Sequence, residues 1–327
     1  LVRQTPGWAT IPVAFSRGDG NWDITNGAAP NFIPSWAPTP GVRVVTGDFN
    51  GNGLTDVALV RQQAGWATIP VAFSRGDGNW DITNGGAPDF IPSWAPTPGV
   101  KVITGDFNGN GLTDIALVRQ QPGWATIPIA FSRGDGNWDV TNGAAPDFIT
   151  AWASTPGARI VTGDFNGNGL TDIALVRQTP GWATIPIAFA RGDGNWDITN
   201  APAPNFIPNW AATPGTRIVT GDFNGNGLTD IALVRQTPGW GSIPIAFAQG
   251  DGTWQVTNGA APDFIPSWAP TPGVKIVTGD FNGNGLTDIA LVRQTPGWGS
   301  IPIAFAQGDG TWQITNGAAP NFIPSWA

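Results

Sequence analysis

A repeated ten-residue stretch, GDFNGNGLTD, constrains this chain more than any other feature. It first occurs at residues 47–56 and returns four times, each copy beginning 58 residues after the one before. The 18 tryptophans follow the same period in three registers of six, which begin at Trp8, Trp22 and Trp36. A fixed period of this length is typical of proteins built from copies of one supersecondary unit. The sequence therefore predicts a single domain over residues 1–327. Its repeat segments are 1–37, 38–95, 96–153, 154–211, 212–269 and 270–327.

The repeated loop carries the oxygen atoms that a hard cation binds. Side-chain oxygens occupy loop positions 1, 3, 5 and 9, and a leucine supplies the backbone carbonyl at position 7. Calcium prefers about six to eight oxygen ligands, and this spacing is similar to the first half of an EF-hand loop, although strands rather than helices are expected on either side. We predict about five structural Ca²⁺ ions; a turn held by Asn and Asp side chains without metal is the alternative. The predicted ligands are Asp48, Asn50, Asn52, Leu54, Asp56, Asp106, Asn108, Asn110, Leu112, Asp114, Asp164, Asn166, Asn168, Leu170, Asp172, Asp222, Asn224, Asn226, Leu228, Asp230, Asp280, Asn282, Asn284, Leu286 and Asp288.

Each repeat predicts four short antiparallel strands, and no helical period is sustained. A GDG turn joins the last two strands, and a proline-rich connection, residues 84–99 in the second segment, leads to the next repeat. Such units are typical of β-propeller blades. We predict an all-β, six-bladed β-propeller with 58-residue repeats, in which one blade lacks its first strand because the loop occurs only five times. In the second segment the predicted strands are 42–46, 56–61, 66–74 and 80–83.

The composition excludes several classes of function. The chain has no His and no Cys, which removes the commonest general base and the usual zinc ligands. Its acidic residues are all Asp and recur in near-identical copies, whereas catalysis needs one unique arrangement, so we predict that it is not an enzyme. A basic run for nucleic acid and an apolar run of about 18 residues for membrane insertion are both absent.

The turn between the second and third strands combines a cation, an amide and an aromatic ring. Arg61, Gln62 and Trp66 recur in all six copies, whereas the residues between the glutamine and the tryptophan vary. A sugar site needs an apolar plate and a few fixed polar groups. The alternative is that the arginine caps strand ends and the tryptophan fills space between blades. The predicted sugar-binding residues, with the asparagines at the end of the fourth strand, are Arg3, Gln4, Trp8, Arg61, Gln62, Trp66, Arg119, Gln120, Trp124, Arg177, Gln178, Trp182, Arg235, Gln236, Trp240, Arg293, Gln294, Trp298, Asn84, Asn142, Asn200 and Asn258.

Two strings in each repeat carry a family resemblance that covers essentially the whole chain. GDFNGNGLTD followed by IAL resembles the FG-GAP/VCBS repeat, and GWATIPVAFSRGDGNWDITN is similar to the blades of fungal propeller lectins of the Psathyrella velutina type. The resemblance implies a calcium-bearing propeller that binds terminal N-acetylglucosamine, and in some members sialic acid, in pockets between neighbouring blades.

These observations predict a multivalent lectin whose partners are glycans or glycoproteins with terminal amino sugars. An extracellular or cell-surface location is favoured, and an oligomer is compatible with the incomplete blade. The alternative is a calcium-stabilised scaffold for protein interaction or adhesion that binds no sugar, as in the propeller head of integrin α-chains. An engineered or recently duplicated repeat chain would inherit the same sites.

Overall fold

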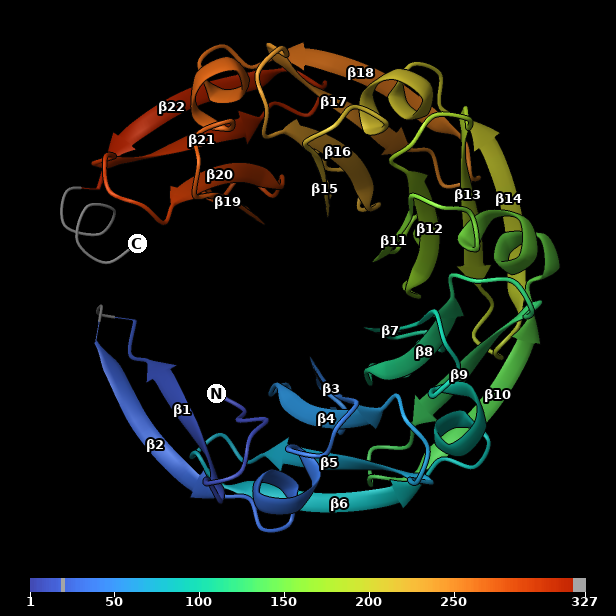
Figure 1. The fold of residues 1–327 in the computed structure, drawn as a ribbon. Coiled ribbons are helices and arrows are strands. Elements are labelled where there is room, and N and C mark those ends of the chain that lie inside the picture. The colour runs from blue at the N-terminus through green and yellow to red at the C-terminus, as the bar shows by residue number, and fades with distance from the viewer. Residues whose placement is uncertain (19–20, 320–327) are drawn as a thin grey trace. The chain divides into compact units, whose positions relative to one another are not determined.

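The computed structural model describes residues 1–18 and 21–319, so Trp326 and Asp19 of the first GDG turn lie outside the described residues. Within these ranges the strands form six antiparallel sheets, and each sheet keeps its strands in chain order (Figure 1). Five sheets have four strands and the first has two. This confirms the predicted class, an all-β chain of repeated four-stranded blades with the fold of a six-bladed β-propeller.

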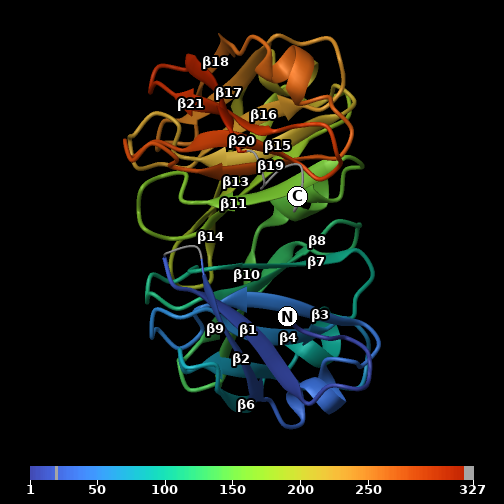
Figure 2. The ribbon, with the colours of Figure 1, turned by 90° about the vertical axis from the view of Figure 1, so that its left-hand side faces the viewer.

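The strand bounds repeat from blade to blade, and Figure 2 shows β1 and β2 of the two-stranded sheet side by side. The first three sheets contain β1 (Thr10–Ser16) and β2 (Trp22–Ala28); β3 (Val42–Gly47), β4 (Asp56–Arg61), β5 (Thr68–Ser74) and β6 (Trp80–Gly86); and β7 (Val100–Gly105), β8 (Asp114–Arg119), β9 (Thr126–Ser132) and β10 (Trp138–Ala144). The last three contain β11 (Ala158–Gly163), β12 (Asp172–Arg177), β13 (Thr184–Ala190) and β14 (Trp196–Pro202); β15 (Thr216–Gly221), β16 (Asp230–Arg235), β17 (Ser242–Ala248) and β18 (Trp254–Ala260); and β19 (Val274–Gly279), β20 (Asp288–Arg293), β21 (Ser300–Ala306) and β22 (Trp312–Ala318).

The chain divides into two compact units, which we describe separately. The first comprises Leu1–Thr155 and Ala190–Asp197, and the second comprises Pro156–Phe189 and Ile198–Ala327. The first unit contains the two-stranded sheet and the sheets β3 to β6 and β7 to β10. The second contains β11, β12, most of β13 and β14, and the sheets β15 to β18 and β19 to β22. Both units use the same contacts between neighbouring blades.

Pairing inside a blade is limited by the proline in its third strand. β4 pairs with β3 along its whole length, but with β5 only at Val57↔Ala72 and Ala58↔Val71. The pairing ends at the residue next to Pro70, because proline has no N–H to donate to a ladder. A proline inside a strand must lie where its missing N–H is not needed for pairing, and Pro70 is unpaired on the side of β4.

The second strand has its predicted bounds, whereas the third and fourth differ. β5 begins at Thr68 rather than at residue 66, and β6 continues to Gly86 instead of ending at residue 83. The reason is a full hairpin register, from Ser74↔Trp80 to Thr68↔Gly86, which extends the outer strand beyond the threonine at its predicted end.

The first sheet lacks its second strand as well as its first. β1 and β2 pair from Thr10↔Ala28 to Ser16↔Trp22, and β1 has β2 as its single strand neighbour in the described residues. Residues 1–3 repeat the last residues of a second strand, and the Leu1 nitrogen donates to the Pro12 carbonyl oxygen at 2.9 Å.

The proline-rich connection contains a short helix, although no helical period is visible in the sequence. The N–H groups of Trp36 and Ala37 donate to carbonyl oxygens five residues earlier, those of Asn31 and Phe32, at 2.9 and 2.8 Å, so the turn is a π-helix. One turn is too short to show a period, and Pro34 is tolerated in it because N–H groups of a first turn lack an intrahelical acceptor. Among the described residues, no helix has the length and apolar character needed to cross a membrane. The helices are η1 (Phe32–Trp36), η2 (Phe90–Trp94), η3 (Phe148–Ala153), η4 (Phe206–Ala211) and η5 (Phe264–Trp268).

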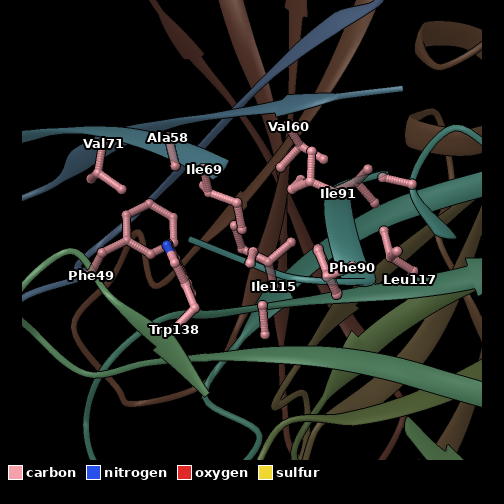
Figure 3. Packing of buried hydrophobic residues seen from close by; sticks show 14 of the residues in the cluster. Phe49, Ala58, Val60, Ile69, Val71, Phe90, Ile91, Ile115, Leu117 and Trp138 are labelled. Atoms are coloured by element: carbon pink, nitrogen blue, oxygen red, sulfur yellow. The ribbon is translucent and has the colours of Figure 1, made fainter. Parts of the chain in front are cut away.

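An aromatic pair recurs where one blade packs against the next. Phe49 is fully buried in its loop, and its ring meets the edge of Trp138 from the next blade, with 5.9 Å between the ring centroids (Figure 3). Such edge-to-face pairs add about 0.5–1.5 kcal/mol beyond the burial of their area. The hydrophobic core therefore lies largely between blades, as expected for units too small to bury their own faces. The equivalent pairs are Phe107–Trp196, Phe165–Trp254 and Phe223–Trp312.

A glycine at the end of the first strand allows close approach of the next blade. A Cβ atom on Gly221 would lie 2.4 Å from Cγ2 of Thr287, whose N–H donates to the Asp222 carbonyl oxygen at 2.7 Å. We expect Gly221→Ala to lower the free energy of unfolding by about 1–3 kcal/mol, because a β-branched threonine cannot move aside without losing this contact. Urea unfolding measures the change. Gly279→Ala is the matched control, because its Cβ would meet nothing nearer than 3.5 Å. Equal effects of the two substitutions would contradict the explanation.

Candidate functional site

The five predicted cation-binding loops connect the first and second strands of their blades. In the first loop, Asp48 Oδ1 accepts a hydrogen bond from Gly51 N at 2.7 Å and Oδ2 accepts one from Gly53 N at 2.8 Å. The side-chain carbonyl oxygens of Asn50 and Asn52 accept backbone N–H groups two residues further along. The side-chain oxygens of Asp48, Asn50 and Asn52 therefore accept N–H groups of the loop's own backbone, and Asp48 Oδ1 accepts a second one, from Asn52 N at 3.2 Å. Gly51 and Gly53 have φ values of 76° and 79°, which residues with a Cβ rarely adopt.

The aspartate at loop position 9 is buried and ties the loop to the third strand. Asp56 is fully buried; its Oδ2 accepts from Phe49 N at 2.9 Å and its Oδ1 from Ser74 N at 2.8 Å. The same two contacts are made by Asp114, Asp230 and Asp288. This carboxylate is therefore a structural element of the blade in addition to being a predicted ligand.

The two carboxylates of a loop lie close enough to affect each other. The pKa of Asp56 is raised from its usual 3.8 to about 6, chiefly by burial and to a smaller extent by the charge of Asp48, although the backbone N–H groups of Ser74 and Phe49 lower it. Burial likewise raises the pKa of Asp114, Asp230 and Asp288. A divalent cation between the two carboxylates would remove this repulsion.

The chemical type of the donor atoms in each loop suits calcium. Two carboxylates, two amide oxygens and one backbone carbonyl per loop are the hard oxygen ligands that calcium takes in a flexible shell. Within the described part of the chain, three or more acidic, histidine or cysteine side chains nowhere cluster into a metal site. A cation in these loops would therefore depend on asparagine and backbone oxygens as much as on charge.

The buried aspartates predict how the stability of the metal-free chain depends on pH. Burial raises the pKa of Asp114 and of Asp230 to about 7, above the usual 3.8. Their contribution to stability is therefore fully present below about pH 4 and is lost as the pH rises through about 7. We expect the urea midpoint, measured with a chelator, to be lower at about pH 8 than at about pH 5.

An exposed aspartate supplies the control for this experiment. The N–H of Asn137 lowers the pKa of Asp135, so its titration falls below the pH window that is compared. Asp135→Asn should leave the pH dependence unchanged. A midpoint that rises between the two pH values would contradict the assignment to the buried carboxyls.

At the other end of the blade, the structure brings the predicted arginine and tryptophan together. The guanidinium carbon of Arg61 lies 5.7 Å from the centre of the Trp66 ring, and all six repeats have this contact at 5.5–5.9 Å. Trp66 also packs against the hydrophobic clusters on either side of its blade. The arginine therefore covers part of one ring face and orders the turn.

The predicted glutamine connects its blade to the next. Gln62 Nε2 donates to the carbonyl oxygen of Val100, the first residue of the following blade's first strand, at 3.0 Å. Gln4, Gln178 and Gln236 make the same contact at 2.8–3.0 Å. The amide nitrogen thus has a packing role, which leaves the amide oxygen to line the space between blades.

Polar cavities lie beside these glutamines between neighbouring blades of the second unit. One, of about 460 Å³, is lined by Arg217, Gln236 and Lys275 among others. Another, of about 320 Å³, is lined by Arg159, Gln178 and Arg217. Arg217 Nε donates to Gln236 Oε1 at 3.0 Å, and Arg159 repeats this contact with Gln178 at 3.1 Å. The predicted glutamine therefore lies in a cavity with two cations from adjacent blades.

These cations were not predicted from the sequence, and we call them the strand-one basic residues. They are exposed and occupy the second position of the first strand, within an otherwise apolar run. An invariant positive charge at that position was the signal that could have revealed them. The strand-one basic residues are Arg43, Lys101, Arg159, Arg217 and Lys275.

The predicted asparagines and tryptophans lie outside these cavities. Asn84 is exposed inside β6, opposite Pro70, rather than at the strand end. Asn142, Asn200 and Asn258 occupy the same exposed position. The residues that line the 460 Å³ cavity include neither Asn258 nor Trp240. The structure thus brings glutamine and strand-one basic residues together, with the arginine–tryptophan stack next to them along the chain.

Solved structures that align with this chain include lectins. A lectin from Agrocybe aegerita, described as recognising non-reducing terminal N-acetylglucosamine, aligns with a TM-score of 0.73 at 19% identity over 97% of this chain and 76% of that chain. The fungal lectin of Aleuria aurantia, a six-bladed β-propeller with a fucose recognition mode, aligns with a TM-score of 0.45 at 18% identity over 98% and 90% of the two chains. The first alignment shows a shared fold.

A curated relative matches part of the chain. An alpha-amylase of Niallia circulans is 28% identical over 121 residues, which are 36% of this chain and 9% of that protein. The chain therefore spans about a tenth of the length of the curated relative that it matches.

A family model describes the repeats themselves. The model for the FG-GAP-like repeat matches residues 106–175, 164–233 and 222–291, which together make up more than half of the chain. Each match begins at the first aspartate of a loop and ends inside the second strand of the next blade. The chain therefore belongs to the family of FG-GAP-like repeat proteins.

Proposed function

We propose that this protein is a multivalent lectin that binds sugars in the polar cavities between neighbouring blades. The observation that carries the proposal is the repeated cavity in which a glutamine and strand-one basic residues converge. Fixed donors of this kind, in a cavity of a few hundred Å³, suit the hydroxyl and acetamido groups of a saccharide unit. The fold shared with the Agrocybe aegerita lectin supports the same class of ligand.

Terminal N-acetylglucosamine is the sugar we favour. It is the ligand named for the Agrocybe aegerita lectin, and the Psathyrella velutina-type resemblance implies the same sugar. The cationic side chains Arg217 and Lys275 would also tolerate the carboxylate of sialic acid. Weak single sites gain about 10²–10⁴ in avidity when a rigid body presents several of them to a clustered surface.

Calcium in this proposal is structural. The five loops would each hold one Ca²⁺ through the predicted Asp, Asn and leucine carbonyl ligands. They lie at the opposite end of the blade strands from the glutamine turn, because each connects the first and second strands whereas the glutamine follows the second strand. The ion would then hold the first hairpin of a blade without touching sugar.

A binding role is favoured over an enzymatic one. The buried aspartates, such as Asp114, have both carboxylate oxygens engaged by backbone N–H groups, which leaves them poorly placed to act on a substrate. The partial similarity to an alpha-amylase covers 9% of that enzyme and so supports a shared repeat segment rather than a shared active site.

Replacing the strand-one basic residues should abolish sugar binding while the fold persists. We expect the quintuple variant Arg43→Ala, Lys101→Ala, Arg159→Ala, Arg217→Ala and Lys275→Ala to lose at least tenfold in affinity for immobilised N-acetylglucosamine, because each cavity loses its charged donors. All five side chains are exposed, so folding should be little affected. The arginines of the GDG turns supply the control, since Arg17, Arg75, Arg133 and Arg191 are equally exposed.

The test is binding to a surface coated with N-acetylglucosamine, with the free sugar as competitor, together with agglutination of glycan-bearing cells. A lectin binds the surface, is released by the free sugar and clumps the cells. A protein-interaction scaffold does none of these. If the GDG-turn variant lost binding and the strand-one variant kept it, the site would lie at the other end of the blade.

A further inference from the structure

Neighbouring cation-binding loops are joined by hydrogen bonds across the boundary between blades. The Thr113 N–H donates to the Asp48 carbonyl oxygen at 2.7 Å, and the Asp48 N–H donates to Thr113 Oγ1 at 3.0 Å. Asp164 and Thr229 repeat this reciprocal pair at 2.7 and 3.1 Å. In both pairs the aspartate is at position 1 of one loop, and the threonine is at position 8 of the loop in the following blade. The neighbouring loop therefore holds both backbone groups of a predicted ligand.

The threonine lies between two predicted ligands of its own loop. Thr229 follows Leu228, whose carbonyl oxygen is the predicted ligand at position 7, and precedes Asp230, the predicted ligand at position 9. Asp230 is fully buried, and its carboxylate accepts from Phe223 N and from Ala248 N, each at 2.9 Å. Whatever fixes the oxygens on either side of the threonine therefore also fixes the threonine.

Side-chain packing adds a second connection between the same two loops. The Leu228 side chain lies against the glycine at position 4 of the preceding loop, because a Cβ atom on Gly167 would be 2.9 Å from Leu228 Cδ2. The Phe165 ring of the preceding loop meets Trp254 of the following blade, with 5.8 Å between the ring centroids. The order of one loop therefore depends on the order of the next through polar and apolar contacts.

The second unit contains three of these loops in succession, at residues 164–172, 222–230 and 280–288. The middle loop contacts the first through the reciprocal pair described above. It contacts the last because Thr287 N donates to the Asp222 carbonyl oxygen at 2.7 Å. The middle loop is therefore connected to both of the others.

We propose that neighbouring loops bind Ca²⁺ cooperatively and that the threonine at position 8 links them. The inference rests on the structural calcium ions proposed above. Ordering of Leu228 and Asp230 by a bound ion would hold Thr229 in place, and would thereby hold Asp164. The preceding loop then has less conformational entropy to lose when it binds its own ion. Coupling of this kind is reciprocal, and we expect each ion to tighten binding at a neighbouring loop at least about fivefold.

The first experiment titrates the metal-free full chain with Ca²⁺ by isothermal titration calorimetry. The unaltered chain should give a steeper curve than independent sites would give. The double variant Thr113→Val and Thr229→Val should reduce the coupling at both linked pairs to less than about twofold. Valine keeps the methyl group that packs on the preceding strand, but it cannot accept the aspartate N–H.

The matched control is the double variant Thr179→Val and Thr237→Val, at the end of the blades away from the loops. The Thr237 hydroxyl accepts from Arg235 Nε at 2.9 Å and donates to the Pro214 carbonyl oxygen at 3.0 Å. Thr179 makes the equivalent two hydrogen bonds. This variant therefore loses hydroxyl contacts of the same kind, and it should keep the steep calcium curve.

Two single variants test the coupling by the position of the loops. Asp280→Ala disables the last loop of the second unit and leaves the first and middle loops adjacent. Asp222→Ala disables the middle loop and so separates the first from the last. Both variants keep the same number of intact loops, so a difference between their curves cannot come from the number of sites. We expect Asp222→Ala to lose more of the cooperativity.

The outcomes separate this inference from the proposals on which it rests. Calcium binding to independent sites, an unchanged curve for Thr113→Val with Thr229→Val, or equal curves for Asp222→Ala and Asp280→Ala would overturn the cooperativity and leave the structural ions in place. Absence of calcium binding would overturn both. Sugar binding enters none of these measurements, so the lectin assignment stands or falls separately.

Discussion

The Asp114→Ala variant should lose about 2–5 kcal/mol of unfolding free energy, measured by urea unfolding in a chelating buffer. The Asp114 carboxylate is fully buried and accepts from Phe107 N at 3.0 Å and from Ser132 N at 2.8 Å. Removing it leaves two buried N–H groups without acceptors, at about 1–3 kcal/mol each. Because a folded domain has a margin of only about 5–15 kcal/mol, this blade should unfold early.

The chelator and two companion variants separate the causes. In the chelating buffer, the loss of unfolding free energy in Asp114→Ala measures the two hydrogen bonds alone. When the same comparison is made in calcium, any additional loss measures the contribution of the bound ion. Asp139→Ala is the control, because Asp139 is exposed and its carboxylate lies 3.5 Å from the Arg133 guanidinium. Asp114→Asn should be intermediate, since its amide oxygen can accept only one of the two N–H groups well. An unchanged midpoint for Asp114→Ala would show that the buried carboxylate does not hold the hairpin.

Removal of calcium should lower the melting temperature of the whole chain. A ligand at about 100 times its dissociation constant stabilises the folded state by about 2.7 kcal/mol per site, and the sequence contains five equivalent loops. Blades couple mainly to their neighbours, so the effect should spread along the chain. Differential scanning fluorimetry with EDTA, with added calcium and with magnesium measures it. Magnesium should restore less, because it demands a rigid octahedral shell.

The order of the losses distinguishes a structural from a sugar-binding ion. EDTA should reduce thermal stability first and glycan binding only as blades loosen. Loss of glycan binding with an unchanged melting temperature would instead place calcium in the sugar site. Equal melting temperatures and equal glycan binding in EDTA and in calcium would favour the alternative that the loops are turns held by their own Asp and Asn side chains.

The repeat made the blades predictable because it is written in local chemistry. The run from Asp56 to Arg61 has no alternation, which indicates burial on both faces, and β4 has those bounds. The proline in the third strand and the GDG turn fixed the remaining strands to within a few residues. The π-helices were not predictable, since one turn that contains a proline leaves no period in the sequence.

The candidate site was less predictable because it depends on neighbouring blades. Sequence spacing linked Arg61 to Trp66, which are in contact within one turn. It could not show that Gln62 bonds to the carbonyl of Val100, 38 residues away. For the same reason the strand-one basic residues were missed, because Arg217 and Gln236 meet across two strands of a blade and Lys275 comes from the next one.

The most direct test of the lectin assignment is calorimetric titration of the intact chain with N-acetylglucosamine, backed by a panel of glycans that end in amino sugars. Repeated cavities predict several equivalent weak sites per chain, and a stoichiometry that falls when strand-one basic residues are replaced. If the chain bound no glycan with a terminal amino sugar, in calcium and at ligand concentrations up to about 10 mM, where sites as weak as about −3 kcal/mol would still be detected, the assignment would be contradicted.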